Sequence, residues 1–491
     1  MRALLVTSVG ITCAAALTLP LAAPALSAPP AHSASALPPE SPGAGPPSVR
    51  AAALHAAESA GSTQSLPLEP LAAPSDRSMG PATAGQGLER RTARPFSLVG
   101  VVWDDAEAEL HGTVQVRTRE TGSANWSDWQ DVETHNAEHA ADLGSDERSS
   151  GAVRGATAPL WVGASDGVEV RVRPEPADPQ DRSEAAPLPE GLRLELVDPG
   201  PDPAPEPAAE TAPEPARAAP VGRTATTAAF ALNPSPPTTT PAVVPEVLTA
   251  EAEAASAVNA ELAPLGASVI PALTKAQTEE AANVAPGAKP YIGPRPGIIT
   301  RKGWGADEKL RERQFAYTKT VKAAFVHHSA TGNNYTCKQA PSVLRSIYRY
   351  HVKSSGWRDF GYNFAVDKCG NIYEGRAGGV TKAVLGAHTL GFNTNTMGIA
   401  VLGSYSSTNP PAAAVTAVSK LTAWKLGLFG ANPKGKVTLT SGGSNKYKAG
   451  AKVKMNVISG HRDGFATECP GARLYKKLGK ARTSSAKLQG R

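Results

Sequence analysis

The amino-acid sequence predicts an α/β fold, a mixed central β-sheet with flanking helices, preceded by a β-rich, sandwich-like domain. Two observations support this prediction. From about residue 291 onward, apolar runs typical of strands alternate with amphipathic stretches typical of helices, which is the pattern of a sheet covered by helices. Between residues 94 and 199 only strand-like alternation occurs. Stretches rich in Pro and Ala separate these blocks, and such composition predicts disorder.

The first 28 residues have the pattern of a secretory signal peptide. One Arg is followed by an apolar run and then by small residues, so we expect cleavage after Ala28 or a few residues later. An uncleaved anchor fits less well, because Pro20 interrupts the run before the roughly 20 residues needed to span a bilayer. The chain is therefore predicted to be secreted, to act outside the cell or in the cell wall, and to keep no transmembrane segment. Residues 29–93 are rich in Ala, Pro and Ser, which predicts a disordered leader.

The β-rich domain, residues 94–199, is predicted from period-2 patterns. The runs VQVRTR, VEVRVR and LRLELV alternate apolar with polar or charged residues, as half-buried strands do. Trp126, Trp129 and Trp161 fit either a carbohydrate-binding platform or packing within the domain. The residues of this domain do not by themselves indicate a chemistry.

A linker rich in Pro and Ala is predicted over residues 200–290, the α/β domain over residues 291–480, and a basic tail over residues 481–491. In the α/β domain, the runs KAAFVHH, YNFAVD, NIYEGR and MGIAVLG predict strands. The stretches APSVLRSIYRYHVKSSGW and PPAAAVTAVSKLTAWKLGLFG predict helices, because their apolar residues recur on one face.

Three residues of the α/β domain form a candidate zinc site. His327, His461 and Cys469 lie in the contexts FVHHSA, SGHRDG and TECPG. His and Cys are ligands that zinc prefers, and three protein ligands leave a fourth tetrahedral position open, as a catalytic site requires. Each context alone also fits an ordinary strand end or a buried Cys. The prediction depends on their occurrence together, in this order.

The remaining cysteines predict one disulfide. Of the four cysteines, Cys13 leaves with the signal peptide and Cys469 is assigned to the metal. Cys337 and Cys369 are left, and the oxidising exterior of a cell favours their pairing. Two free thiols are the less favoured alternative.

Charge divides the chain into two opposite parts. Residues 291–491 hold 32 Lys/Arg and 8 Asp/Glu, a balance of +24, whereas residues 1–290 hold 18 and 36, a balance of −18. A basic exported domain favours a polyanionic partner such as the cell-wall polymer, although a charged surface is as often only solvated. Nucleic acid fits the charge but not the candidate site. The opposite charges also predict a contact between the acidic amino-terminal part and the basic domain.

Six motifs together resemble one known family. FVHHSA, GWRDFGYNF, GNIYEGR, VLGAHTLGFNTNTMGIAVLG, SGHRD and TECPG occur in the order found in the peptidoglycan recognition proteins, the type-2 N-acetylmuramoyl-L-alanine amidases. The similarity runs from about Arg301 to Leu478, and the β-rich block resembles the amino-terminal module of secreted actinobacterial members. The resemblance implies a type-2 amidase-like fold, a zinc ion in a groove, and hydrolysis of the amide between the lactyl group of N-acetylmuramic acid and the L-alanine of the stem peptide.

The resemblance also implies roles for residues around the metal. It places His327, His461 and Cys469 as ligands and Tyr362 as a catalytic donor, while Thr467 is placed to add a hydroxyl hydrogen bond. Further candidates fit either substrate binding in the groove or a purely structural role: His388, Asn393, Arg376 and His351.

Two other functions fit the same fold. One is a non-catalytic wall-binding receptor, and the other is a structural or adhesion protein whose β-rich domain is the functional part. Receptors of this family typically lack the cysteine ligand. This chain has all three ligands and Tyr362, which favours the enzyme.

Overall fold

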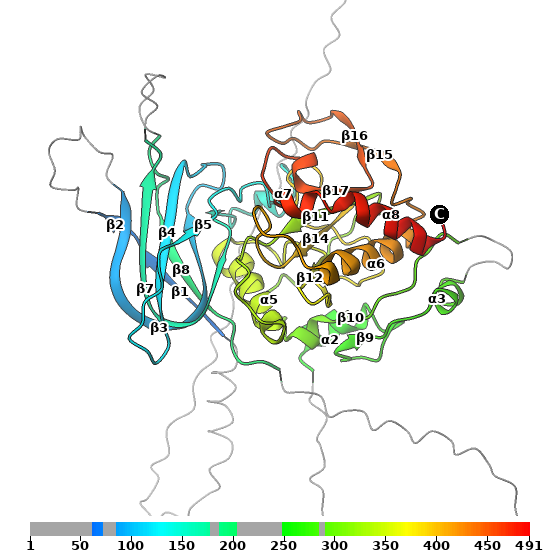
Figure 1. The fold of residues 1–491 in the computed structure, drawn as a ribbon, viewed down its shortest axis with the longest axis horizontal. Coiled ribbons are helices and arrows are strands. Elements are labelled where there is room, and N and C mark those ends of the chain that lie inside the picture. Colours follow the sequence, from blue (N-terminus) through cyan, green and yellow to red (C-terminus); the bar gives the residue numbers. More distant parts are fainter. Residues whose placement is uncertain (1–60, 72–84, 177–185, 204–247, 284–289) are drawn as a thin grey trace, which may run out of the picture. The chain divides into compact units, whose positions relative to one another are not determined.

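The computed structural model describes residues 61–71, 85–176, 186–203, 248–283 and 290–491. The predicted signal peptide, most of the predicted leader and much of the predicted linker lie outside these ranges. Residues 53–491 fall within one compact unit, whose described part contains a β domain and an α/β domain (Figure 1). No helix within the described ranges has both the length and the apolar character needed to cross a bilayer. The predicted fold class is confirmed.

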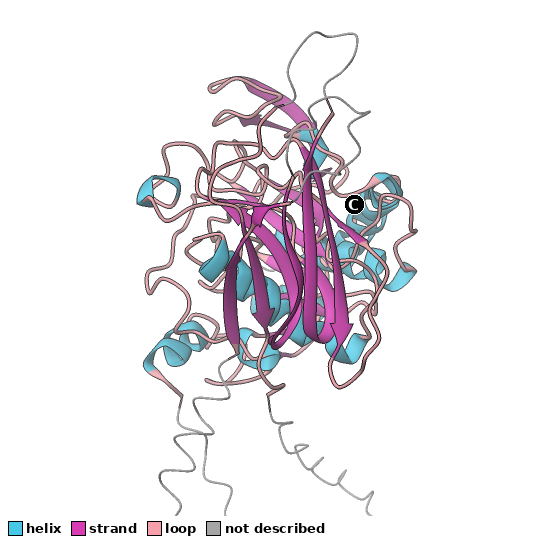
Figure 2. Ribbon diagram, turned by 90° about the vertical axis from the view of Figure 1, so that its left-hand side faces the viewer, coloured by secondary structure: helices cyan, strands magenta, loops and turns pink. Residues whose placement is uncertain are grey.

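The β domain is a single eight-stranded sheet (Figure 2). Its strands are β1 (Ser62–Pro67), β2 (Glu69–Pro70), β3 (Gln86–Trp103), β4 (Gly112–Glu120), β5 (Gln130–Val132), β6 (Gly155–Ala156), β7 (Leu160–Pro174) and β8 (Arg193–Asp198). They follow the order β1-β8-β3-β7-β4-β5, with β2 and β6 also paired to β3. Register shifts between β3 and β7 mark irregularities of the kind that bend strands. Apolar side chains of β3, β4, β7 and β8 meet in one core, so the domain is sandwich-like in its packing but has one continuous sheet.

The β domain begins earlier than predicted. β1 pairs antiparallel with β8, and β3 begins at Gln86, although both segments were assigned to a disordered leader. β1 is an edge strand with the sequence STQSLP and is half-buried at most positions. An edge strand needs few apolar residues, which is why composition concealed it.

The three tryptophans of the β domain pack against other side chains. Trp161 is buried, and guanidinium groups lie over the other two rings. The Arg90 guanidinium carbon is 5.0 Å from the centre of the Trp126 ring, and that of Arg171 is 4.0 Å from the centre of the Trp129 ring. These contacts favour packing over an open carbohydrate-binding platform.

The α/β domain has a seven-stranded mixed sheet in the order β17-β11-β14-β12-β13-β10-β9. Its strands are β9 (Val269–Ile270), β10 (Ile298–Ile299), β11 (Ala323–His328), β12 (Phe364–Val366), β13 (Ile372–Glu374), β14 (Thr396–Val401) and β17 (Ile458–Gly460), and a separate hairpin joins β15 (Lys436–Thr440) to β16 (Lys452–Asn456). β11 is parallel to both of its neighbours, β14 and β17. Apolar residues along these strands are fully buried, because helices cover the sheet on both faces.

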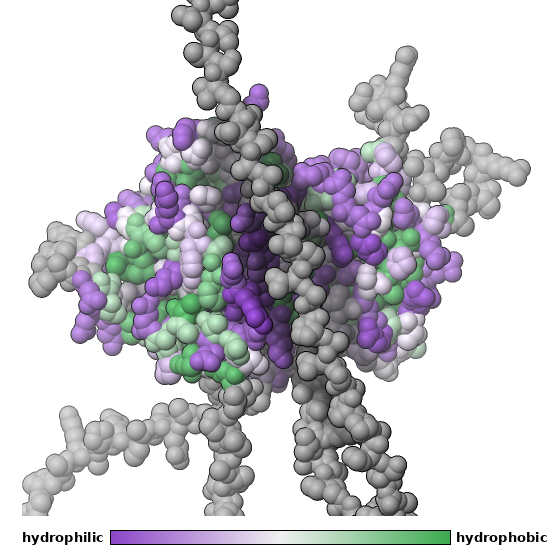
Figure 3. Space-filling view, turned by 180° about the vertical axis from the view of Figure 1, so that it is seen from behind, coloured by the Kyte–Doolittle hydropathy of each residue, from purple (hydrophilic) through white to green (hydrophobic). Residues whose placement is uncertain are grey.

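Helices of the α/β domain form two groups. One core contains side chains of α6 (Ala412–Leu428) and α8 (Leu478–Gln489), which lie side by side (Figure 1), and the other contains side chains of α5 (Ala340–Arg349). The short helices are α2 (Ala250–Ala257), α3 (Lys275–Ala281), α4 (Arg301–Trp304) and α7 (Ala472–Tyr475). Hydrophilic and hydrophobic side chains are interspersed on the face seen in Figure 3.

Both boundaries of the α/β domain differ from the prediction. Residues 248–283, assigned to the linker, contain α2, α3 and β9, and β9 pairs with β10. The Asn259 side chain donates a hydrogen bond of 2.8 Å to the buried Glu374 carboxylate. The predicted basic tail is part of α8, whose Ala481 and Ser485 are buried against α6. Residues 248–283 are rich in Ala and follow a Pro-rich stretch, and residues 481–491 are polar, so composition did not show that one face of each is buried.

The β domain packs against α5. Leu98 and Trp161 of the β domain share a core with Ile347 of α5. The Tyr350 hydroxyl, just after α5, donates a hydrogen bond of 3.1 Å to the carbonyl of Thr157. This contact brings the loop between β5 and β6 to the carboxyl ends of β11 and β17.

Candidate metal centre

Two neighbouring parallel strands bring together the three predicted ligands. His327 is the penultimate residue of β11, and His461 directly follows β17, which pairs with β11. Because the strands are parallel, their carboxyl ends meet at one edge of the sheet, where ligands of α/β sheets commonly bind. Cys469 follows in the next loop, and all three side chains are buried. His328 faces the other side of β11, as alternation along a strand requires, and accepts a hydrogen bond from the Tyr405 amide.

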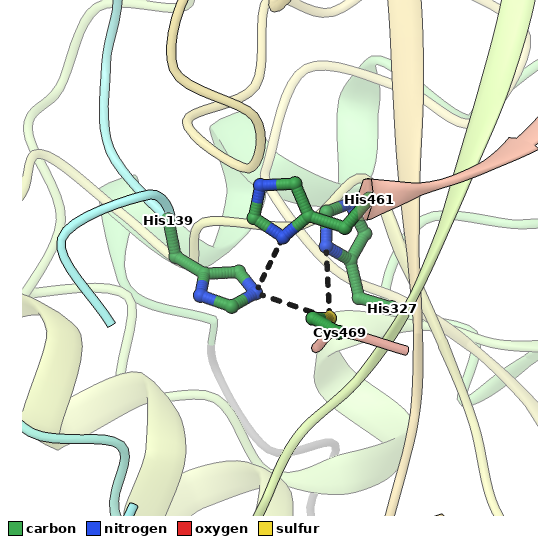
Figure 4. Close-up of side chains that lie close together, drawn as sticks. All are labelled: His139, His327, His461 and Cys469. Atoms are coloured by element: carbon green, nitrogen blue, oxygen red, sulfur yellow. Dashed lines mark hydrogen bonds between the residues drawn. The ribbon is translucent and has the colours of Figure 1, made fainter. Parts of the chain in front are cut away.

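A fourth side chain, His139 of the β domain, completes this cluster (Figure 4). Its Nε2 atom is 3.2 Å from His461 Nδ1 and 3.6 Å from Cys469 Sγ, and His327 Nδ1 is 3.8 Å from the same sulfur. Tetrahedral zinc with about 2.0 Å to nitrogen and about 2.3 Å to sulfur requires ligand separations of roughly 3.3–3.6 Å. A nitrogen from a distant loop therefore lies beside the three predicted ligands, where an open fourth position was expected.

The chemistry of the four side chains fits zinc. Burial lowers the pKa of His139, His327 and His461 well below the ordinary histidine value, so the rings are neutral at neutral pH, as metal ligands must be. Burial also raises the pKa of the Cys469 thiol, so its thiolate needs a nearby positive charge such as a metal ion. Thr389 Oγ1 lies 3.4 Å from the Nε2 atom of His327, on the side away from the cluster.

Tyr362 and His351 lie beside the cluster. Both line one small cavity together with Cys469 and Thr467. The Tyr362 ring centre is 5.3 Å from that of His327, and burial raises the pKa of its phenol, which therefore stays a hydrogen-bond donor. His351 stacks on Trp357, and its Nδ1 accepts a hydrogen bond of 3.2 Å from the Gly361 amide.

Both domains of the chain match known families. Residues 317–472 match the N-acetylmuramoyl-L-alanine amidase family, and residues 50–192 match the Rv3811 N-terminal galactose-binding domain-like family. Peptidoglycan-recognition protein SC2 of Drosophila simulans is 30% identical over 183 residues, covering 37% of this chain and 84% of that protein. The chain belongs to the peptidoglycan recognition protein family.

Other relatives of the peptidoglycan recognition domain include an enzyme and a solved complex. Human N-acetylmuramoyl-L-alanine amidase is 31% identical over 187 residues, covering 37% of this chain and 28% of the human protein. The structure of peptidoglycan recognition protein LE in complex with tracheal cytotoxin is 28% identical, with a TM-score of 0.30, and covers 37% of this chain and 92% of that one.

Thr467, predicted as an auxiliary catalytic donor, and two of the residues predicted to bind substrate already have partners. Thr467 donates a hydrogen bond of 2.7 Å to Glu138. Arg376 donates to both oxygens of Glu147, at 2.8 and 2.9 Å. The Asn393 amide group donates to the Ala140 carbonyl. These three partners lie in the loop that carries His139.

His388 has no exposed surface and lies behind His327, with ring centres 5.4 Å apart. Its backbone amide donates to the Asn393 side chain, and its ring contacts Thr389. This placement is structural, since it supports His327 and Asn393 from within the domain. The predicted disulfide between Cys337 and Cys369 is present, with a Cα–Cα distance of 6.1 Å.

Sequence reasoning missed His139 and its acidic neighbours. They lie in the stretch ETHNAEHAADLGSDE, between β5 and β6. Because this stretch lacks strand or helix periodicity, it predicts a loop of more than 20 residues up to β6. Loops longer than about 12–15 residues inside a compact domain are usually functional. The length of this loop and its two histidines could therefore have marked it as a candidate part of the site.

Proposed function

We propose that the chain is a secreted, zinc-dependent N-acetylmuramoyl-L-alanine amidase, of the type found with an amino-terminal β domain. It hydrolyses the amide between the lactyl group of N-acetylmuramic acid and the L-alanine of the peptidoglycan stem peptide. The observation that carries the proposal is the meeting of His327, His461 and Cys469, next to Tyr362, at one sheet edge. A receptor needs neither a metal nor this donor, so the complete set favours an enzyme over a wall-binding module.

His327, His461 and Cys469 would hold the metal in the active form. Zinc, when bound, supplies Lewis acidity and brings the pKa of a coordinated water from 15.7 toward about 7. Two neutral imidazoles and one thiolate leave this centre with a single positive charge. Hydrogen-bond donors from the chain therefore matter more than at an all-histidine site.

Tyr362 is the donor best placed to serve the reaction. Its phenol is buried and protonated, so it can donate a hydrogen bond to the oxygen that becomes negative as water attacks the scissile carbonyl. Thr467 adds a neutral hydroxyl on the same cavity. Arg376 and Asn393 offer a charged and a neutral donor, which suit the carboxylates and carbonyls of a stem peptide.

The experiment is digestion of purified peptidoglycan by the zinc-loaded chain, followed by mass spectrometry. Stem peptides with a free L-alanine amino group, and glycan with intact lactyl carboxyl groups, support the proposal at whatever rate they form. The control is the same protein after chelation, then with zinc restored. New reducing ends without free L-alanine would identify a glycosidase, and no product from any zinc-loaded form would overturn the proposal.

Secretion is tested separately. We expect the mature protein in culture medium to begin near residue 29, as determined by amino-terminal sequencing. A protein retained in cells with Met1 in place would contradict this part of the proposal.

A further inference from the structure

Residues 133–147 of the β domain, here named the covering loop, lie against the metal centre and its surroundings. Glu138, His139 and Glu147 of this loop are at most 6% exposed. Burial of two carboxylates and an imidazole from a surface loop is unusual, because such groups lose hydration unless they gain specific partners. Each of them has one in the α/β domain.

The first contact closes the metal centre. His139 Nε2 lies 3.2 Å from His461 Nδ1 and 3.6 Å from Cys469 Sγ. The four ligand atoms all lie within 4.8 Å of one another. Four protein ligands are typical of structural zinc sites, whereas catalytic sites keep one position for water or substrate. With His139 in place, the centre has the ligand set of a closed site.

The second group of contacts occupies Thr467, the predicted auxiliary catalytic donor, and Arg376, a predicted substrate-binding residue. Glu138 accepts from Thr467, and Glu147 accepts twice from Arg376. Burial opposes the ionisation of Glu147, but the Arg376 guanidinium outweighs it and holds the pKa of that carboxyl below its ordinary value.

Asp142 extends this set of contacts. Its carboxylate accepts from the Gly391 amide and from the Asn393 side chain, both at 2.8 Å, and the Ala140 carbonyl accepts from the same Asn393 amide group. The loop thus offers carboxylates and carbonyls to the donors that would bind a stem peptide, which carries the same chemical groups.

We propose that the covering loop is an intramolecular inhibitor and that His139 is a fourth, displaceable metal ligand. The intact chain is a latent amidase, which becomes active when the loop leaves and frees both the metal position and the groove. This inference rests on the proposed function. It adds that the substrate competes with a segment of the same chain.

The test compares three full-length proteins: the parent, His139→Ala, and His135→Ala as a matched control. His135 is a histidine of the same loop, but it is exposed. Metal affinity is measured by competition with a chromophoric chelator. We expect His139→Ala to weaken zinc binding by about tenfold or more, as loss of a contributing ligand should, and His135→Ala to match the parent. Equal affinity in all three proteins would overturn the role of His139 as a ligand.

The second measurement uses a soluble muramyl tripeptide and metal-free protein, so that binding is read without turnover. The variants are Asp142→Asn with Glu147→Gln, which keep His139 but weaken the hold of the loop on the groove, and Asp146→Asn as a control on an exposed loop carboxylate. The double variant should bind about tenfold more tightly than the parent, because affinity scales with the fraction of open protein. Unchanged binding would overturn the inhibitor role.

The third measurement is the rate of L-alanine amino-group release by zinc-saturated proteins. We expect His139→Ala to exceed the parent by about tenfold or more, on the same population argument. If product forms equally fast in parent and variants, the latency proposal fails and the amidase stands. If the variants bind the muramyl peptide more tightly but no protein releases product, the amidase fails and the covered groove stands.

Discussion

Two different parts of the molecule contribute to the metal cluster. The sheet of the α/β domain holds His327 and His461, whereas the covering loop of the β domain holds His139. β11 is an inner strand and β17 the first strand of the sheet order, both are buried, and His327 and His461 have no exposed surface. The covering loop lies between β5 and β6, strands of three and two residues, and has little regular structure. Removing the sheet ligands would disrupt a core, whereas the covering loop joins two strands that pair with different partners, β4 and β3. One cluster thus combines a permanent half with a removable one.

Among the substitutions that distinguish these two halves, the largest loss of zinc and of turnover is expected at Cys469. Cys469→Ser should lose stoichiometric zinc and at least about 10³-fold in turnover, because the hydroxyl is a poor replacement for a thiolate ligand. His139→Ala should change activity in the opposite direction. Metal analysis and peptidoglycan digestion of both variants check this contrast. Two variants that lose activity together would place His139 in the permanent half.

Tyr362 tests whether the permanent half carries the chemistry. Tyr362→Phe should keep zinc and lose roughly 10²–10³ in turnover, the scale of one oxyanion donor. The matched control is Tyr335→Phe, a buried tyrosine in the same domain whose hydroxyl donates to the Leu402 carbonyl. Turnover near the parent level in Tyr362→Phe would show that the ring only packs against the metal.

The disulfide between Cys337 and Cys369 lies in the same domain as the three sheet-side ligands. Its removal should affect stability alone. Replacing Cys337 and Cys369 by Ser opens a loop of 32 residues, which costs about 3.5 kcal/mol on the chain-entropy estimate. Chemical denaturation of the oxidised parent and the variant measures the difference. The zinc content of the folded variant should equal that of the parent, and a coupled loss of zinc would show that the disulfide also positions the ligands.

Glu374 should make the stability of the α/β domain depend on pH. Burial raises the pKa of this carboxyl to about 7, against opposing hydrogen bonds from Asn259 and the charge of Arg301. The folded state therefore holds the proton more tightly than the unfolded state. The protonated Glu374 carboxyl therefore stabilises the fold fully below about pH 4.5. This contribution to the free energy of unfolding is at most about 3 kcal/mol and is lost as pH rises through about 7.

Glu374→Gln should flatten the dependence of unfolding free energy on pH between about 5 and 8. The difference between parent and variant isolates this group from the nearby Lys425, whose pKa burial lowers to about 7. Parallel curves for the two proteins would contradict the assignment.

The smallest effect concerns the opposite charges of the two parts. A protein of residues 248–491 should bind cell wall more strongly than the intact chain at low salt, because the acidic part no longer competes for the basic surface. The gain should shrink with salt, since the Debye length falls from about 30 Å at 0.01 M to about 8 Å at 0.15 M. Weaker binding by the shortened protein at every salt concentration would instead show that the β domain binds wall.

The sequence predicts the three ligands of the α/β domain well and His139 of the covering loop poorly, for a physical reason. His327 lies near the end of KAAFVHH, which was predicted as a strand and is β11, whereas β17 before His461 was not predicted and His461 was found through its motif. The position of His139 depends on how a whole β domain packs on α5, and no local pattern encodes that. The same limit applies to Asn259 and to β1, because their partners are distant in the sequence. Cys469 was found through its motif, whereas no motif indicated that His139 lies beside it.

The contact between α5 and the β domain has a consequence for proteolytic processing. The Tyr350 hydroxyl bonds the Thr157 carbonyl, Ser354 bonds Glu195, and Arg345 bonds Asp202. All three contacts join the two sides of any cut made between residues 204 and 247. A protease acting there would sever the covalent connection and still leave two fragments that migrate as one particle. Maturation of such a protein would require a second event that pulls the fragments apart, and gel filtration of the nicked chain under native conditions would show them together.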